Sequence, residues 1–221
     1  SNLSFAQAKE LGIYLLPLQI TIDETTYQDT LEISTQDIYN ELANGKMPKT
    51  SMAAYQKIYD LFEELKKDYD TIFAVPLTNG LSTNASTMQS IARELEMNVH
   101  VIDMYATCAL EKHVAIWIKK LVDANKSSEE ILEIIRPAID ESNSLILVKD
   151  LQHLKRGGRL TPMAAALAGL LKIYPVLHIN KSTEGRIDVL NKVRTEKRAD
   201  AYAIDKIMDD IDIQHTHIYI I

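Results

Sequence analysis

The strongest constraint on the fold of this chain is the alternation of short apolar runs with longer amphipathic segments. The apolar run at residues 71–75 is followed by a helix-like segment at 82–96, and the run at 99–102 is followed by another at 106–124. Strands that alternate with helices are typical of α/β folds, in which a helix joins neighbouring parallel strands. The pattern therefore predicts an α/β fold whose first half contains a mainly parallel sheet.

Capping and turn signals predict further elements. Ser34 precedes a helix as its N-cap, with Asp37 as the capping-box partner. Thr161-Pro162 begins another helix with proline at its favoured first position, and residues 48–51 read as a loop. The remaining predicted helices lie at 5–11, 52–67, 127–139 and 194–209, and the remaining predicted strands at 13–22, 25–27, 145–148, 174–179, 187–190 and 215–221.

The second half of the chain has fewer strands than the first and reads as a separate α/β layer. Polar residues replace the apolar period at 140–143, which indicates a domain boundary there. The sequence therefore predicts two α/β domains, residues 1–141 and 142–221. The chain opens on a helix without a preceding strand and closes inside an apolar run, so we expect segments to be missing at both ends.

Composition excludes several classes of protein. The 221 residues carry a net charge of −7, which argues against a nucleic-acid-binding protein. The longest apolar run, residues 163–171, is too short to span a bilayer. Cys108 is the single cysteine, so an internal disulfide is excluded and a reducing cytoplasm is the expected location. Cys108 itself reads as a small apolar side chain rather than a nucleophile.

The segment 150–161 contains the pair Gly157-Gly158 followed by Arg159, directly before a strongly apolar helix. Adjacent glycines usually mark a turn with positive φ or a close approach of two backbones. Arg159 is then well placed to hold an anion or an acidic group of a partner. The alternative is a basic loop that simply turns.

Two hydroxyl pairs precede predicted helices. Thr50-Ser51 lies before the helix at 52–67, and Ser82-Thr83 lies at the start of the helix at 82–96. Helix N-termini favour anions because their N–H groups lack intrahelical partners. Simple N-capping is the alternative for either pair.

Several standard sites are missing from the sequence. A P-loop motif and a G-x-G-x-x-G motif are both absent, so nucleotide binding has no local support. Gly80-Leu81-Ser82 matches only the first positions of a nucleophile elbow. His215 and His217 lie on one face of the last predicted strand but lack carboxylate or cysteine partners in sequence. We therefore predict no metal and no cofactor.

Four motifs, in order, resemble the DegV family of bacterial lipid-binding proteins. The opening of the family resembles three segments of this chain: Leu11-Gly12-Ile13, Leu16-Pro17-Leu18 and Tyr27-Gln28-Asp29. Residues 48–51 resemble its P-x-T-S loop, and residues 80–82 resemble the start of its S-G-L-S-G-T loop. Residues 151–159 and 170–175 resemble its L-x-x-L-x-x-G-G-R and L-L-x-I-x-P runs.

The resemblance implies a function. DegV-like proteins bury one long-chain fatty acid between two α/β domains and present its carboxylate to a separate fatty acid kinase subunit, which forms an acyl-phosphate. By this resemblance Thr50, Ser51 and Ser82 would bind the carboxylate, and Arg159 would hold the phosphate or dock the kinase. The chain itself would not be an enzyme, and transient contact with a membrane surface is compatible with the role. Residues expected to line an acyl tunnel, with core packing as the alternative, are Ala53, Ile102, Ala164, Leu167 and Leu171.

The chain departs from the family pattern at Thr83-Asn84, where the family has Gly-Thr. The family also carries a C-terminal histidine near the head group, for which this chain offers no counterpart. Two other functions stay open: a regulatory module that senses a lipid without a kinase, and a hydrolase or transferase that uses Ser82. The last lacks an evident base and orienting acid in the sequence.

Overall fold

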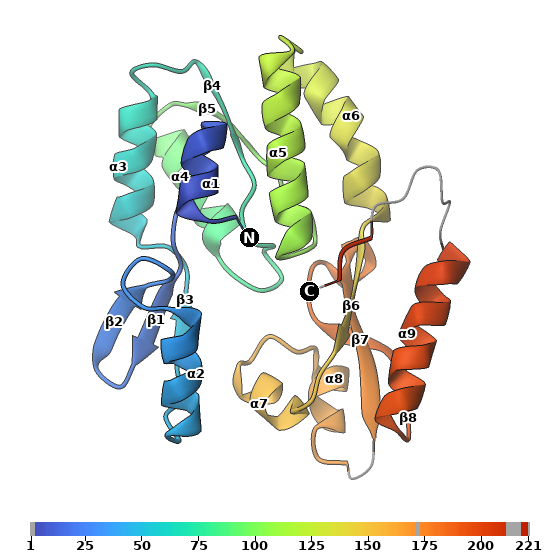
Figure 1. Ribbon diagram of the computed structural model, residues 1–221. Helices are drawn as coiled ribbons and strands as arrows, with labels where there is room; N and C mark the ends of the chain where they lie inside the picture. The colour runs from blue at the N-terminus through green and yellow to red at the C-terminus, as the bar shows by residue number, and fades with distance from the viewer. Residues whose placement is uncertain (1–2, 171–172, 211–217, 221) are drawn as a thin grey trace. The chain divides into compact units, whose positions relative to one another are not determined.

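The computed structural model describes residues 3–170, 173–210 and 218–220, and its contacts divide the chain into two compact units (Figure 1). The first unit comprises Leu3–Pro76 together with Ser82–Ile102. The second comprises Leu77–Leu81 together with the described residues from Asp103 onward. The contacts thus group residues 103–141 with the C-terminal part of the chain, whereas the domain boundary expected near residue 141 stays a prediction.

The first unit contains two small sheets. Strand β1 (Gln19–Ile22) lies between β2 (Thr25–Gln28) and β3 (Lys49–Ser51) and is antiparallel to both. Strands β4 (Thr71–Ala74) and β5 (Asn98–Val101) form a parallel pair. The α/β class is confirmed, and its parallel part is the β4–β5 pair. Strands β1 and β2 pair antiparallel because a two-residue turn joins them directly, and β3 adds to the other edge of β1.

Four helices complete the first unit: α1 (Phe5–Leu11), α2 (Thr35–Ala43), α3 (Tyr55–Leu65) and α4 (Asn84–Glu94). The capping box between Ser34 and Asp37 is formed as predicted. Helices α3 and α4 pack through fully or nearly fully buried side chains, including Ile58, Phe62 and Ile91. This core fixes the start of α4 against the segment that leads from β3 into α3.

The second unit is built on an antiparallel sheet. Strand β7 (Tyr174–Asn180) lies between β6 (Asn143–Leu147) and β8 (Asp188–Val193). Helix α9 (Glu196–Asp210) covers one face through Ala199 and Ala203 against Val176. Ala164 of α8 (Pro162–Leu167) packs with Leu177 and Ile179 of β7 in a separate buried cluster. The other elements of this unit are α5 (Ala109–Asp123), α6 (Ser128–Glu141), α7 (Leu151–Arg156) and the short 3-10 helix Lys181–Thr183.

Four sequence expectations differ from the structure. The strand expected at 13–22 is confined to Gln19–Ile22. Residues 49–51 are a strand rather than a loop, because they pair with β1. Their polar side chains gave no sign of this pairing in the sequence. The helix expected from residue 52 begins at Tyr55. Helix α7 was not expected; Asp150 caps it by accepting from the His153 N–H (2.9 Å). The strand predicted at 215–221 falls largely outside the described residues.

Candidate functional site

The structure brings together the two hydroxyl-bearing segments of the first unit. The Ala53 N–H, just after β3, donates to Asn84 Oδ1 at the start of α4 (3.1 Å). The Thr83 hydroxyl donates to the Met52 sulfur (3.2 Å). Residues 31 positions apart in sequence are therefore in direct contact, and the segments that carry Thr50-Ser51 and Ser82 lie beside each other.

Thr50 and Ser51 lie in β3. The sequence had suggested a position at a helix N-terminus instead. Both are exposed. Thr50 pairs with Ile20 and Ser51 pairs with Gln19. Since successive side chains of a strand point to opposite faces, Thr50 and Ser51 face opposite sides of the sheet. A ligand at one face of the sheet can therefore meet only one of the two hydroxyl groups directly.

Ser82 lies at the N-terminus of α4, as predicted. Its Oγ accepts a hydrogen bond from the Asn84 N–H (3.3 Å), and the side chain is half-buried. Thr83 is the N-cap residue, with φ −84° and ψ 8°. The φ angle is negative, and residues with a Cβ atom adopt this region at turns, so the position does not require glycine. The replacement of the family glycine by Thr83 therefore introduces no backbone strain here.

Arg159 lies in the second unit, directly after the Gly157-Gly158 turn. Gly158 has φ 75°, the positive value that the glycine pair predicted. The Arg159 Nε donates to the Leu81 carbonyl oxygen (3.4 Å), and its Nη1 donates to the Gly157 carbonyl oxygen. Arg159 is therefore held against the residue that immediately precedes Ser82 in the chain.

The segment Leu77–Leu81 is held within the second unit by close backbone contact. A Cβ atom built on Gly80 would lie 2.2 Å from the Gly185 carbonyl carbon, and one built on Gly185 would lie 1.9 Å from Thr78 Oγ1. Gly185 also has φ 73°, and Thr78 is fully buried. Only glycine permits this approach at both positions.

Four of the five residues expected to line an acyl tunnel are buried in the cores of their own units. In the first unit Ala53 is 1% exposed, and Ile102 is buried and donates its N–H to the Ala74 carbonyl oxygen (2.8 Å). In the second unit Ala164 and Leu167 are buried in or near α8. Leu171 lies outside the described residues. A role in contacting an acyl chain stays a prediction for all five.

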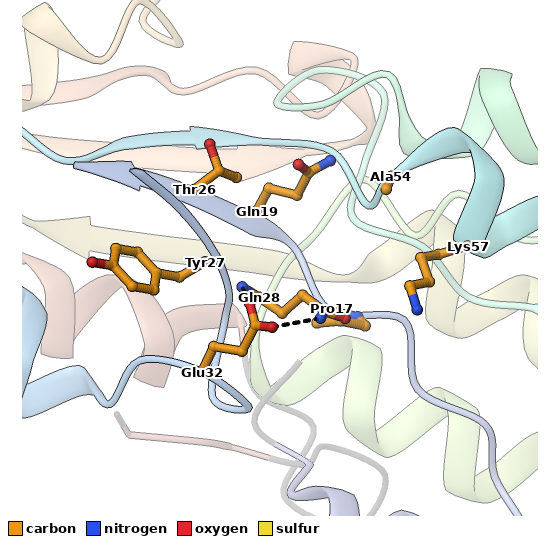
Figure 2. A pocket seen from close by; sticks show the side chains of 8 residues that line it. All are labelled: Pro17, Gln19, Thr26, Tyr27, Gln28, Glu32, Ala54 and Lys57. Carbon is orange, nitrogen blue, oxygen red and sulfur yellow. Dashed lines mark hydrogen bonds between the residues drawn. The ribbon is translucent and has the colours of Figure 1, made fainter. Parts of the chain in front are cut away.

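A pocket of about 310 Å³ opens in the first unit beside β1, β2 and the start of α3 (Figure 2). Glu32 accepts hydrogen bonds from the Gln28 N–H (2.7 Å) and side-chain amide (3.1 Å), and the backbone bond holds the pKa of Glu32 below its usual value. Gln19 also donates to the Met52 carbonyl oxygen (3.3 Å). The lining residues are Pro17, Gln19, Thr26, Tyr27, Gln28, Glu32, Ala54 and Lys57.

Sequence reasoning missed Gln19, Thr78 and Gly185, and it treated Asn84 only as a departure from the family pattern. The isolated glycine at 185 was the one local signal of a close approach. Within the described ranges, no cluster of three or more His, Cys, Asp or Glu side chains could hold a metal ion. In the same ranges, no helix is both long and apolar enough to cross a membrane. His215 and His217 lie outside the described residues.

Comparisons with known proteins agree with the arrangement of these motifs. The family model described as "Uncharacterised protein, DegV family" matches residues 1–221. A DegV domain-containing protein of Halalkalibacterium halodurans is 33% identical over 87% of this chain and 68% of its own length. Protein DegV of Bacillus subtilis is 30% identical over 85% of this chain and 66% of its own length.

Solved structures show the same fold. A fatty acid binding DegV family protein of Streptococcus agalactiae superposes with a TM-score of 0.87 at 28% identity, over 96% of this chain and 76% of that chain. DegV of Bacillus subtilis, described as a fatty acid binding protein, superposes with a TM-score of 0.81 at 27% identity, over 93% of this chain and 73% of that one. The match of the family model along the whole chain and the identity to these relatives lead to one conclusion: the chain belongs to the DegV family.

Proposed function

We propose that this chain binds one long-chain fatty acid and presents its carboxylate to a separate ATP-dependent kinase subunit. One observation carries the proposal: a DegV family chain holds two hydroxyl-bearing segments side by side, at β3 and at the N-terminus of α4. Relatives of this fold at 27–28% identity are described as fatty acid binding proteins.

The carboxylate would accept hydrogen bonds from the hydroxyl groups of Ser82 and of Thr50 or Ser51. Hydroxyl donors near a helix N-terminus stabilise a carboxylate without a buried cation. A tail of ~15 methylenes at about 0.8 kcal/mol each contributes roughly 12 kcal/mol before the costs of association. The tail would thus supply most of the affinity, and the head group would set its orientation.

The chain would supply no catalytic group to the transfer. In the kinase complex, a carboxylate oxygen would attack the γ-phosphorus of ATP, and the bond from that phosphorus to the bridging oxygen of ADP would break. The products are an acyl-phosphate and ADP. Arg159 would hold the transferred phosphoryl group or contact the kinase, since its planar guanidinium can bind either a phosphate or a carboxylate in a bidentate manner.

Extraction of the purified, folded protein with organic solvent, followed by mass spectrometry, tests the binding step. We expect one long-chain fatty acid per chain. An extract without lipid, from protein that also fails to take up added fatty acid, would exclude binding.

Addition of a fatty acid kinase subunit and ATP to the loaded protein tests presentation of the carboxylate. An acyl-phosphate, trapped by hydroxylamine as a hydroxamate, is the expected product. Lipid binding without this product would favour a regulatory lipid sensor instead.

A further inference from the structure

The peptide unit between Met52 and Ala53 is held from both ends by side chains of other elements. The Met52 carbonyl oxygen accepts from Gln19 Nε2 of β1 (3.3 Å), and the Ala53 N–H donates to Asn84 Oδ1 of α4 (3.1 Å). In a trans peptide the C=O and N–H groups point in opposite directions. Gln19 and Asn84 therefore form hydrogen bonds to this peptide from opposite sides.

Asn84 also contacts the other hydroxyl-bearing segment. Its backbone N–H donates to Ser82 Oγ (3.3 Å), while its side chain accepts from the Ala53 N–H. Ala53 follows Ser51 by two positions, and Asn84 follows Ser82 by two positions. Asn84 thus contacts both the segment that follows β3, which carries Thr50 and Ser51, and the Ser82 hydroxyl.

Burial makes this link difficult to replace by water. Ala53 is 1% exposed and Asn84 is 5% exposed. A buried N–H that loses its acceptor is strongly disfavoured, so the segment would have to shift to satisfy it elsewhere. The Met52 sulfur adds further contacts to α4, because it accepts from the hydroxyl groups of Thr83 (3.2 Å) and Thr87 (3.5 Å).

We propose that Asn84 is a positioning residue for head-group recognition: it holds one β3 hydroxyl, that of Thr50 or Ser51, and the Ser82 hydroxyl at the spacing that a carboxylate requires. The inference rests on the proposed function and deepens it. Hydrogen bonds to a carboxylate weaken steeply with poor alignment, so a shift of one segment lowers affinity for the charged head group. The alkyl tail makes no use of this alignment.

The test compares two ligands with the same tail. Dissociation constants are measured for hexadecanoic acid and hexadecan-1-ol on the wild-type protein and on Asn84→Leu. We expect Asn84→Leu to bind the acid about tenfold or more weakly, and the alcohol with less than about a threefold change. Hydrogen exchange of the Ala53 amide should accelerate in the variant, since its acceptor is gone.

Asn98→Leu is the control. Asn98 is an exposed residue of β5 in the same unit, and its side chain donates to Thr71 Oγ1 (2.9 Å). It should leave the ratio of acid to alcohol affinity unchanged. If Asn84→Leu does not fold, Asn84→Ser replaces it, because a serine side chain is too short to reach the Ala53 amide.

The outcomes are distinct. An equal loss of affinity for both ligands, or an unchanged ratio with a faster Ala53 exchange, would overturn the positioning role while leaving fatty acid binding in place. A wild-type protein that binds neither ligand would overturn the proposed function itself.

Discussion

At the scale of single residues, the Ser82 hydroxyl is oriented by the backbone. Its oxygen accepts from the Asn84 N–H (3.3 Å), so the O–H hydrogen is directed away from that bond. A hydroxyl fixed in this way can donate to an anion with little loss of rotamer freedom. A substitution of Ser82 is therefore a direct test of how the head group is recognised.

Ser82→Ala should weaken fatty acid binding by about tenfold or more, because one hydrogen bond to a charged group contributes ~1.5–3 kcal/mol. A titration calorimeter or a fluorescent fatty acid gives the dissociation constant. Ser90→Ala, an exposed serine of the same helix, is the control and should bind as the wild type does. Unchanged affinity in Ser82→Ala would remove this hydroxyl from the head-group site.

Asp188 gives a prediction about pH. The Thr161 hydroxyl donates to Asp188 Oδ1 (2.5 Å), and this bond, more than any other contact, holds the pKa of Asp188 below its usual value. A lowered folded-state pKa contributes stability that is fully present above the usual Asp value of ~4 and is lost as pH falls through the folded pKa.

Thr161→Val should therefore raise the pKa of Asp188, whereas Thr161→Ser should keep it low. NMR titration of the carboxyl carbon measures both. The difference in free energy of unfolding between Thr161→Val and the wild type should also become smaller as pH falls through the pKa that Asp188 has in the folded protein. A gap that stays constant from neutral to acid pH would mean that the hydrogen bond does not act through Asp188.

At the scale of elements, the segment between β4 and α4 is shaped by the β7–β8 connection. Gly185 presses its backbone against Thr78 and Gly80, at distances that leave no room for a Cβ atom on either glycine. The turn is thus defined by a contact between segments that lie about a hundred residues apart in the sequence. A side chain at position 185 would therefore cause both backbone strain, because φ is positive, and steric overlap with Thr78.

Gly185→Ala should destabilise the protein by roughly 2–5 kcal/mol, since an alanine at positive φ costs about 1–2 kcal/mol and overpacking about 1–3 more. Gly158→Ala separates the two costs. Gly158 has φ 75° but nothing within 4 Å of its added Cβ, so only the strain applies. Urea unfolding of both variants should show the larger loss for Gly185→Ala; equal losses would contradict the overlap.

Elements with local signals were predictable, and those that depend on distant partners were not. The capping box at Ser34 and the Thr161-Pro162 helix start both formed where the sequence placed them. Strand β3 was read as a loop because Lys49–Ser51 lacks apolar alternation and becomes a strand only through β1.

The same division holds for the candidate site. Motif order pointed to Thr50-Ser51 and Ser82, and local geometry now places Ser82 at the start of α4. The bond from Ala53 to Asn84 joins residues 31 positions apart, and the packing of α3 on α4 creates it. Hydrophobic periodicity carries no information about such a bond, so sequence reasoning could not find it.

At the scale of the whole molecule, the proposed binding and docking residues belong to different units. Thr50, Ser51 and Ser82 lie in the first unit, and Arg159 lies in the second. Arg159 donates hydrogen bonds to the carbonyl oxygens of Leu81 and Gly157, which belong to the same unit as Arg159. Lipid binding and productive contact with a kinase should therefore respond to different substitutions.

Arg159→Ala should leave the fatty acid dissociation constant within about twofold of wild type and should lower the rate of acyl-phosphate formation by at least about tenfold, the effect expected of a lost charge-assisted contact. Arg156→Ala, an exposed cation at the end of α7, serves as the control. A folded Arg159→Ala protein that is phosphorylated at the normal rate would exclude the docking role.

The placement of Leu77–Leu81 has a consequence for how the chain can be divided. The backbone passes between the two units at residues 76–77, 81–82 and 102–103. A fragment that ends at residue 102 would carry Thr78 and Leu81 without the Gly185 turn and the Leu160 cluster that bury them. A fragment that begins at residue 103 would lack the segment Leu77–Leu81, which packs against the Gly185 turn. Neither unit is a contiguous piece of sequence, so the two halves of such a cut should recover their structure only by reassociating.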